Sequence, residues 1–98
     1  SDDFPDLVGK NIRILGYLVH RKRTTTRGRY PQQMMFGTFM DMKGKFYDSV
    51  HFPPSFRQYK ITGKGIYELY GKVSSDNGHH SVEVEKMEKL PYQKLVIS

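Results

Sequence analysis

Turn-forming residues interrupt this chain at short intervals, and the stretches between them are rich in β-branched and aromatic residues. Asn77-Gly78 tolerates the positive φ angles of a tight turn. Pro53-Pro54 ends a stretch because proline offers no N–H to a β-ladder. This spacing leaves room for several strands and one short helix. With 98 residues, the chain suits one compact core, so we predict a single all-β domain over residues 1–98.

The predicted elements follow from these turns and from the alternation of apolar residues. Residues 1–10 form a lead-in with a helical turn around residues 5–8, and residues 91–98 form a tail, in which 93–97 is either a terminal strand or a linker. A phase shift near Gly16 predicts a bend where the long first strand serves two sides of a barrel. The five predicted strands and the helix, which would bury Phe56, are residues 11–24, 34–41, 46–52, 55–59 (helix), 66–73 and 81–90. This is the order of the five-stranded Greek-key barrel called the OB-fold, with its short helix between strands 3 and 4.

Positive charge gathers in one part of the chain. Sixteen Lys and Arg oppose ten Asp and Glu, which gives a net charge of +6. No carboxylate lies between Asp6 and Asp41, a stretch with seven basic residues, whereas the rest of the chain has a net charge of −1. Five of the seven fall within residues 21–29, among threonines and before Tyr30. Such a segment supplies phosphate contacts and a stacking surface, so it favours a nucleic-acid partner over the alternative of a merely solvated loop.

Motifs in the middle of the chain give a sharper signal. Residues 14–19 read Ile-Leu-Gly-Tyr-Leu-Val, residues 35–41 read Met-Phe-Gly-Thr-Phe-Met-Asp, and residues 46–53 read Phe-Tyr-Asp-Ser-Val-His-Phe-Pro. With Gly71-Lys72-Val73 and residues 82–86, these segments resemble the nucleic-acid-binding OB domain of the bacterial replicative DNA polymerase III alpha subunit. The first two motifs also occur in OB domains of tRNA synthetases.

This resemblance covers roughly residues 9–91 and implies a domain excised from a longer, cytoplasmic DNA-directed DNA polymerase. Its partners would be single-stranded DNA, held as template during replication, and the rest of the polymerase chain and replication holoenzyme. The active-site carboxylate motifs of the polymerase are not found, so we expect no enzymatic activity in this fragment. A tRNA anticodon-binding domain and a module for protein–protein docking remain the alternatives. The loop at residues 27–34 is longer than in the family pattern because of an insertion at residues 30–33.

The composition sets further expectations about ligands. A chain without cysteine forms no Cys-ligated zinc site, and no apolar run reaches the roughly 20 residues that cross a bilayer. We expect no metal, cofactor, membrane or small-molecule substrate. His79-His80 is interpreted as a loop pair, since adjacent side chains on an extended segment diverge.

An OB barrel binds its ligand on strands 2 and 3, between the loops that join strands 1 to 2 and strands 4 to 5. The likeness to synthetase OB domains points Phe36 outward, where it would stack on a base, and Phe39 into the core; the alternative is that both are core. Tyr47 is expected beside Phe36, and Lys72 with the loop 74–80 is expected to close the other side. The predicted nucleic-acid contacts are Arg21, Lys22, Arg23, Arg27, Arg29, Tyr30, Phe36, Thr38, Lys45, Tyr47 and Lys72.

The third strand raises a question of phase. Asp48 alternates in step with apolar neighbours, and because a buried carboxylate is costly, a bulge near Asp48 is predicted. Ser49, His51 and Asp48 resemble a catalytic triad in composition, but strand alternation points Asp48 away from the other two. We therefore expect His51 to be a surface residue or a hydrogen-bonded structural one, and Asp41 to bond its own turn.

Overall fold

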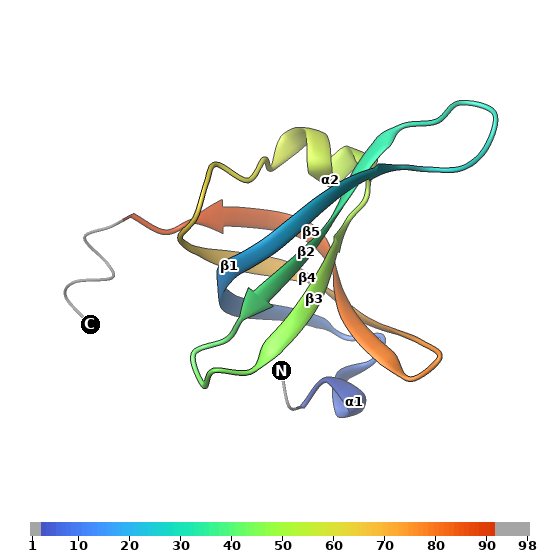
Figure 1. Ribbon diagram of the computed structural model, residues 1–98. Helices are drawn as coiled ribbons and strands as arrows, with labels where there is room; N and C mark the ends of the chain where they lie inside the picture. The colour runs from blue at the N-terminus through green and yellow to red at the C-terminus, as the bar shows by residue number, and fades with distance from the viewer. Residues whose placement is uncertain (1–2, 92–98) are drawn as a thin grey trace.

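The computed structural model describes residues 3–91 and places them in a closed β-barrel with two short helices (Figure 1). Around the barrel the strand order is β1-β2-β3-β5-β4, and all neighbours are antiparallel except β3 and β5, which are parallel. This is the predicted OB-fold barrel, with α2 between β3 and β4. The predicted strand or linker at 93–97 lies outside the described residues. In chain order the elements are α1 Phe4–Leu7, β1 Asn11–Thr25, β2 Gln33–Met40, β3 Phe46–His51, α2 Pro53–Gln58, β4 Ile66–Asp76 and β5 His79–Lys89.

The long strand β1 closes the barrel by changing partners. It pairs with β4 as far as Tyr17 and with β2 from Tyr17 onward, and its register with β2 shifts between Leu18 and His20. The predicted bend therefore lies close to Gly16. A Cβ atom at Gly16 would lie 2.3 Å from Tyr47 Oη, so only glycine lets β1 pass this close to the core ring.

The β4–β5 hairpin is longer than its sequence predicts. Its turn is only two residues, Asn77 with φ 53° and Gly78 with φ 81°, as a tight hairpin turn requires. The ladder consequently continues to the pair Asp76–His79. Both faces of this end of the hairpin are partly solvated, so residues 74–80 are polar. They therefore lack the alternation of apolar residues that would predict a strand. In Figure 1 the orange β4–β5 hairpin and the cyan end of the β1–β2 hairpin extend from the same side of the barrel.

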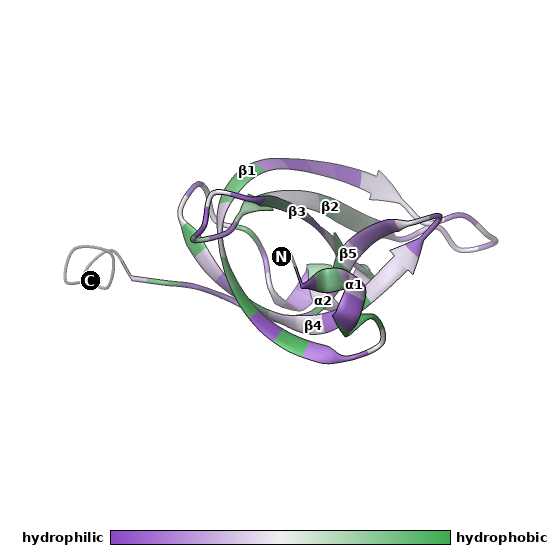
Figure 2. Cartoon of the chain, turned by 90° about the horizontal axis from the view of Figure 1, so that it is seen from below, coloured by the Kyte–Doolittle hydropathy of each residue, from purple (hydrophilic) through white to green (hydrophobic). Residues whose placement is uncertain are grey.

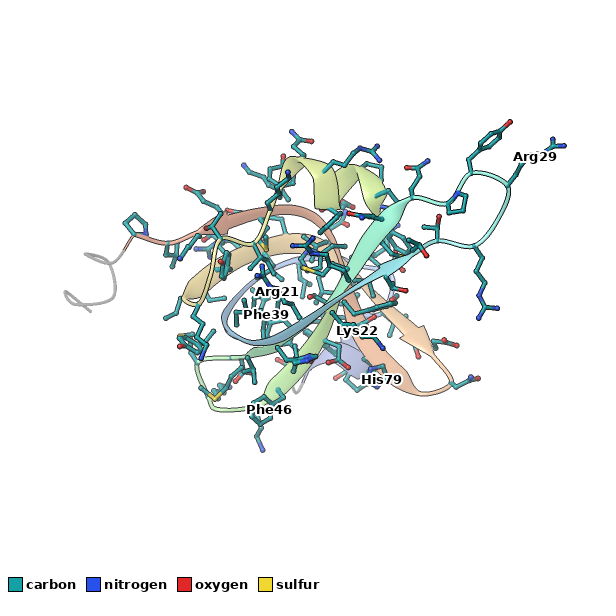
Figure 3. The ribbon with its side chains drawn as sticks, turned by 45° about the horizontal axis from the view of Figure 1, so that its top comes forward. Arg21, Lys22, Arg29, Phe39, Phe46 and His79 are labelled. Atoms are coloured by element: carbon teal, nitrogen blue, oxygen red, sulfur yellow. The ribbon has the colours of Figure 1, made fainter. Side chains whose placement is uncertain are left out.

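Aromatic rings fill the barrel. Phe39 is fully buried, as predicted, and lies 5.8 Å from the Tyr47 ring and 6.0 Å from the Tyr67 ring, centroid to centroid. Phe4 of α1 packs edge-on against Tyr47 at 5.7 Å. Such ring pairs each add about 0.5–1.5 kcal/mol beyond the area they bury. Figure 3 shows Phe39 inside the barrel, and α1, in the predicted lead-in, covers one end of it through Phe4.

The phase of β3 corrects two predictions. Tyr47 is 4% exposed and belongs to the core, not to the binding face. The register between β2 and β3 is regular from Met40–Phe46 to Met35–His51, so the predicted bulge near Asp48 is absent from this pairing. The apolar residue Phe46, which is 64% exposed, faces outward with Asp48, and this leaves the carboxylate near solvent without any irregularity of the strand.

The turns around β2 and β3 meet the expectation for Asp41 and correct that for α2. The Asp41 carboxylate accepts hydrogen bonds from the backbone N–H groups of Lys43 and Lys45, both at 2.9 Å. In α2 the buried residues are Pro53 and Ser55, whereas Phe56 is only half-buried.

Neither helix found in residues 3–91 is long and apolar enough to cross a membrane. In the same part of the chain, no three histidine or carboxylate side chains are grouped as a metal site would require.

Candidate nucleic-acid interface

An open groove of about 620 Å³ lies over the outer face of β2 and β3, between the β1–β2 hairpin and the β4–β5 hairpin. We call it the aromatic groove. The sequence predicted this location, and its far wall includes four residues of the predicted loop 74–80, which the structure places in β4 and β5: Ser74, Ser75, Asp76 and His79. Lys72, which was predicted there too, instead lines a separate hollow of about 350 Å³, together with Glu83 and Glu85.

Two phenylalanine rings form the exposed apolar part of the aromatic groove. Phe36 on β2 is 45% exposed, and Phe52, which follows β3, is 44% exposed. Phe36 faces outward and Phe39 faces inward, as predicted. The two rings lie on opposite faces because residues an odd number apart on a strand point to opposite sides. Exposed rings on a sheet surface are suitable platforms for nucleobases.

Asp48 connects the floor of the aromatic groove to its far wall. Its Oδ1 accepts a hydrogen bond from Thr38 Oγ1 at 3.1 Å, and its Oδ2 lies 2.6 Å from His79 Nε2. The second contact joins β3 to the β4–β5 hairpin across 31 positions of sequence, and it fixes the wall relative to the floor. His79, which Figure 3 labels, lies on this hairpin directly after its turn, paired with Asp76.

The charges that line the aromatic groove do not match the expected basic surface. Lys22 is the one lysine or arginine among its described lining residues, while Asp48, Asp76 and Glu83 contribute three carboxylates. A bound polyanion would therefore be disfavoured if its phosphates pointed into this groove. Uncharged bases would meet no such penalty.

Most of the predicted cations lie on the β1–β2 hairpin, which projects beyond the barrel. Figure 2 shows β1 in the purple of hydrophilic residues between its green bend and its pale end. Arg27, Arg29 and Tyr30 lie in the loop, where Tyr30 is 79% exposed, and Figure 3 shows Arg29 at the far end of this loop. The base of the loop is held by Thr26 N–H donating to Gln32 O at 2.8 Å and by Gln32 N–H donating to Thr26 Oγ1 at 3.0 Å.

Strand alternation divides the remaining cations between the two faces of this hairpin. Lys22 lines the aromatic groove, whereas Arg21 and Arg23 line a different hollow, of about 430 Å³, beside α2. The predicted contacts thus do not form one surface. Lys45 lies apart from both hollows, in the turn between β2 and β3, where its N–H is bonded to Asp41.

Ser49 and His51 form a buried, hydrogen-bonded pair. Both are fully buried, with Ser49 Oγ 2.8 Å from His51 Nε2, while Asp48 faces the opposite side, as predicted. Burial lowers the pKa of His51 to about 4. Burial, with a smaller contribution from Asp41, raises the pKa of Tyr47 well above its usual value. Both groups therefore stay neutral in the core near neutral pH.

Sequence reasoning missed several residues of this region. Phe52 was assigned to the third strand without a role, and His79 was treated as a loop residue, although pairing with Asp76 places it in β5. Arg57 and Lys60 were not considered, yet they line the hollow beside α2 together with Arg21 and Arg23. The signal in the sequence was the pair of positive charges close to the helix, which lies outside the basic segment 21–29.

No protein-family model matches this chain, and no curated protein matches it at a significant level of similarity. The strand order and the lining of the groove define its class: an OB-fold barrel with an open groove that carries two exposed aromatic rings.

Proposed function

We propose that this chain is a domain that binds single-stranded nucleic acid, with DNA as its ligand. The observation that carries the proposal is the pair of half-exposed rings, Phe36 and Phe52, in an open groove next to a projecting basic hairpin. Stacking on such rings contributes about 1–3 kcal/mol per base and tolerates any sequence, because every base has a π-face.

The orientation of the bound DNA strand follows from the charges that line the aromatic groove and the β1–β2 hairpin. Its bases turn toward Phe36 and Phe52, and its phosphates turn away from the carboxylates and toward the cations of the β1–β2 hairpin. Lys22, Arg27 and Arg29 are exposed and available for such contacts. Only unpaired bases can reach the rings, so the proposed ligand is a single strand and not a duplex.

We further propose, from the sequence resemblance, that the domain belongs to a bacterial DNA polymerase III alpha subunit. Its role there would be to hold template DNA in the cytoplasmic replication holoenzyme, while another part of the alpha subunit carries out catalysis. The motifs at residues 35–41 and 46–53 support this proposal, since they form β2, β3 and the entry to α2, around the groove. The coding sequence on either side of the chain tests it: polymerase carboxylate motifs in the same reading frame are expected, and a different neighbouring domain would contradict it.

A second candidate function is protein docking. The three carboxylates around the exposed rings favour a basic, apolar segment of a partner protein, for instance from the same polymerase. Such docking would use the aromatic groove without the basic loop. It therefore predicts that neutralising Arg27 and Arg29 has no effect on binding, whereas the nucleic-acid proposal predicts a clear loss.

Fluorescence anisotropy with a labelled oligothymidine of about 12 nucleotides tests the main proposal. Phe36→Ala should weaken binding by about 5- to 150-fold, the equivalent of one lost stacking contact. Phe46→Ala is the matched control, because Phe46 is even more exposed and lies on β3 but does not line the groove. Equal affinities of the two variants, with both folded by circular dichroism, would contradict the proposal.

A further inference from the structure

The hollow beside α2 has the charge that the aromatic groove lacks. Arg21 and Arg23 enter it from β1, and Arg57 and Lys60 enter it from α2 and the segment that follows. No carboxylate is found among the described residues that line it. We call this surface the basic hollow; its polar members are Arg21, Arg23, Gln32, Gln33, Arg57 and Lys60.

Hydrogen bonds to uncharged acceptors hold two of these guanidinium groups in place. Arg57 Nη1 donates to Gln32 Oε1 at 2.8 Å, and Arg21 Nη1 donates to the carbonyl oxygen of Ile61 at 3.2 Å. Each contact uses one N–H of a group that has five, so donors remain for a ligand. The positive charge is oriented but not neutralised by these contacts.

The position of the basic hollow relates it to the aromatic groove. The two surfaces lie on opposite faces of the same β1–β2 hairpin, since Lys22 lines one and its neighbours Arg21 and Arg23 line the other. Beyond Tyr17, β1 is an edge strand of the sheet, because it pairs with β4 only as far as that residue, whereas β2 continues to pair with β3. A flexible single strand can therefore pass from one surface to the other over the edge of β1.

We infer that the basic hollow binds the phosphates of the same single strand whose bases occupy the aromatic groove. This inference rests on the proposed function and adds a path for the strand. The ligand wraps the β1–β2 hairpin, with stacking on one face and ion pairing on the other. Arg21, Arg23, Arg57 and Lys60 contact phosphate oxygens, and the carboxylates of the groove face only bases.

The salt dependence of binding tests this path. On single strands each phosphate contact contributes about −0.7 to the slope of log Kobs against log salt concentration. Replacing two cations in Arg57→Ala/Lys60→Ala should therefore flatten the slope by about 1.4 for an oligothymidine of about 12 nucleotides. The control Lys43→Ala/Lys86→Ala removes the same charge from exposed positions outside both surfaces and should keep the wild-type slope.

An oligothymidine of about 4 nucleotides, near the lower limit of OB-fold sites, should fill the groove alone and show the same slope with either variant. If the double variant unfolds, Arg23→Gln provides a second test, in which the slope should flatten by about 0.7. A wild-type slope in both hollow variants would overturn the inference and leave the proposed function intact. Equal flattening with the short oligonucleotide would overturn the continuous path. Absence of binding by the unaltered chain would refute the proposed function itself.

Discussion

Acidification should destabilise this barrel through His51. The ring is fully buried, its Nε2 lies 2.8 Å from Ser49 Oγ, and its Nδ1 has no hydrogen-bond partner within residues 3–91. Protonation would place a charged N–H in the core without an acceptor. Burial accordingly lowers the pKa of His51 from 6.5 to about 4 in the folded state.

The direction of the effect follows from the two pKa values. Between them the unfolded chain binds a proton that the folded chain does not, so the free energy of unfolding falls as the pH drops from about 6.5 to about 4 and levels off below. Each unit of pKa difference corresponds to about 1.36 kcal/mol. From about pH 7.5 to about pH 5, His51 alone should therefore remove on the order of 2 kcal/mol of stability.

Urea unfolding at these two pH values, with wild type and His51→Gln, measures this contribution. The variant keeps every other titrating group, so those contributions cancel in the comparison. It should be less stable than wild type at about pH 7.5, and the difference should shrink by on the order of 2 kcal/mol at about pH 5. Parallel loss of stability in both proteins would refute the assignment of a neutral, desolvated His51.

Three further predictions concern the barrel and its groove. Gly16→Ala should cost about 1–3 kcal/mol of stability in thermal unfolding, because its Cβ would lie 2.3 Å from Tyr47 Oη; an unchanged Tm would show that β1 can shift away. Asp41→Ala should cost about 1–3 kcal/mol in urea unfolding, since two backbone N–H groups lose a charged acceptor, and Asp41→Asn, which keeps one oxygen, should cost less. Asp76→Asn should tighten oligothymidine binding by about 2- to 5-fold in anisotropy titrations by removing one carboxylate from the groove wall; weaker binding would mean that Asp76 itself contacts the ligand.

Much of the barrel could be predicted because it depends on local pattern. The turn residues marked each strand, and alternation put Phe36 and Phe39 on opposite faces, while the resemblance to synthetase OB domains indicated which of them faces outward. Tyr47 shows where this reasoning fails. Its phase depended on whether β3 carries a bulge at Asp48, and that is decided by which side chains fill the barrel, a property of all five strands together.

The site was predictable only in its position. Strand alternation alone could have separated Lys22 from Arg21 and Arg23, but the partners of each face come from distant parts of the chain. His79 reaches Asp48 across 31 residues, and Arg57 reaches Gln32 across 25. A cluster of charges in sequence therefore predicted a polyanion partner without showing which charges share a surface.

Titration of the chain with single-stranded DNA, duplex DNA and RNA of equal length, across a series of salt concentrations, tests the central claim most directly. We predict sequence-tolerant, micromolar-range binding to single-stranded DNA that weakens steeply as salt rises and exceeds binding to the duplex. A marked preference for RNA would indicate the anticodon-binding alternative, through contacts to 2′-hydroxyl groups. Binding that favours duplex DNA or does not respond to salt would contradict the account.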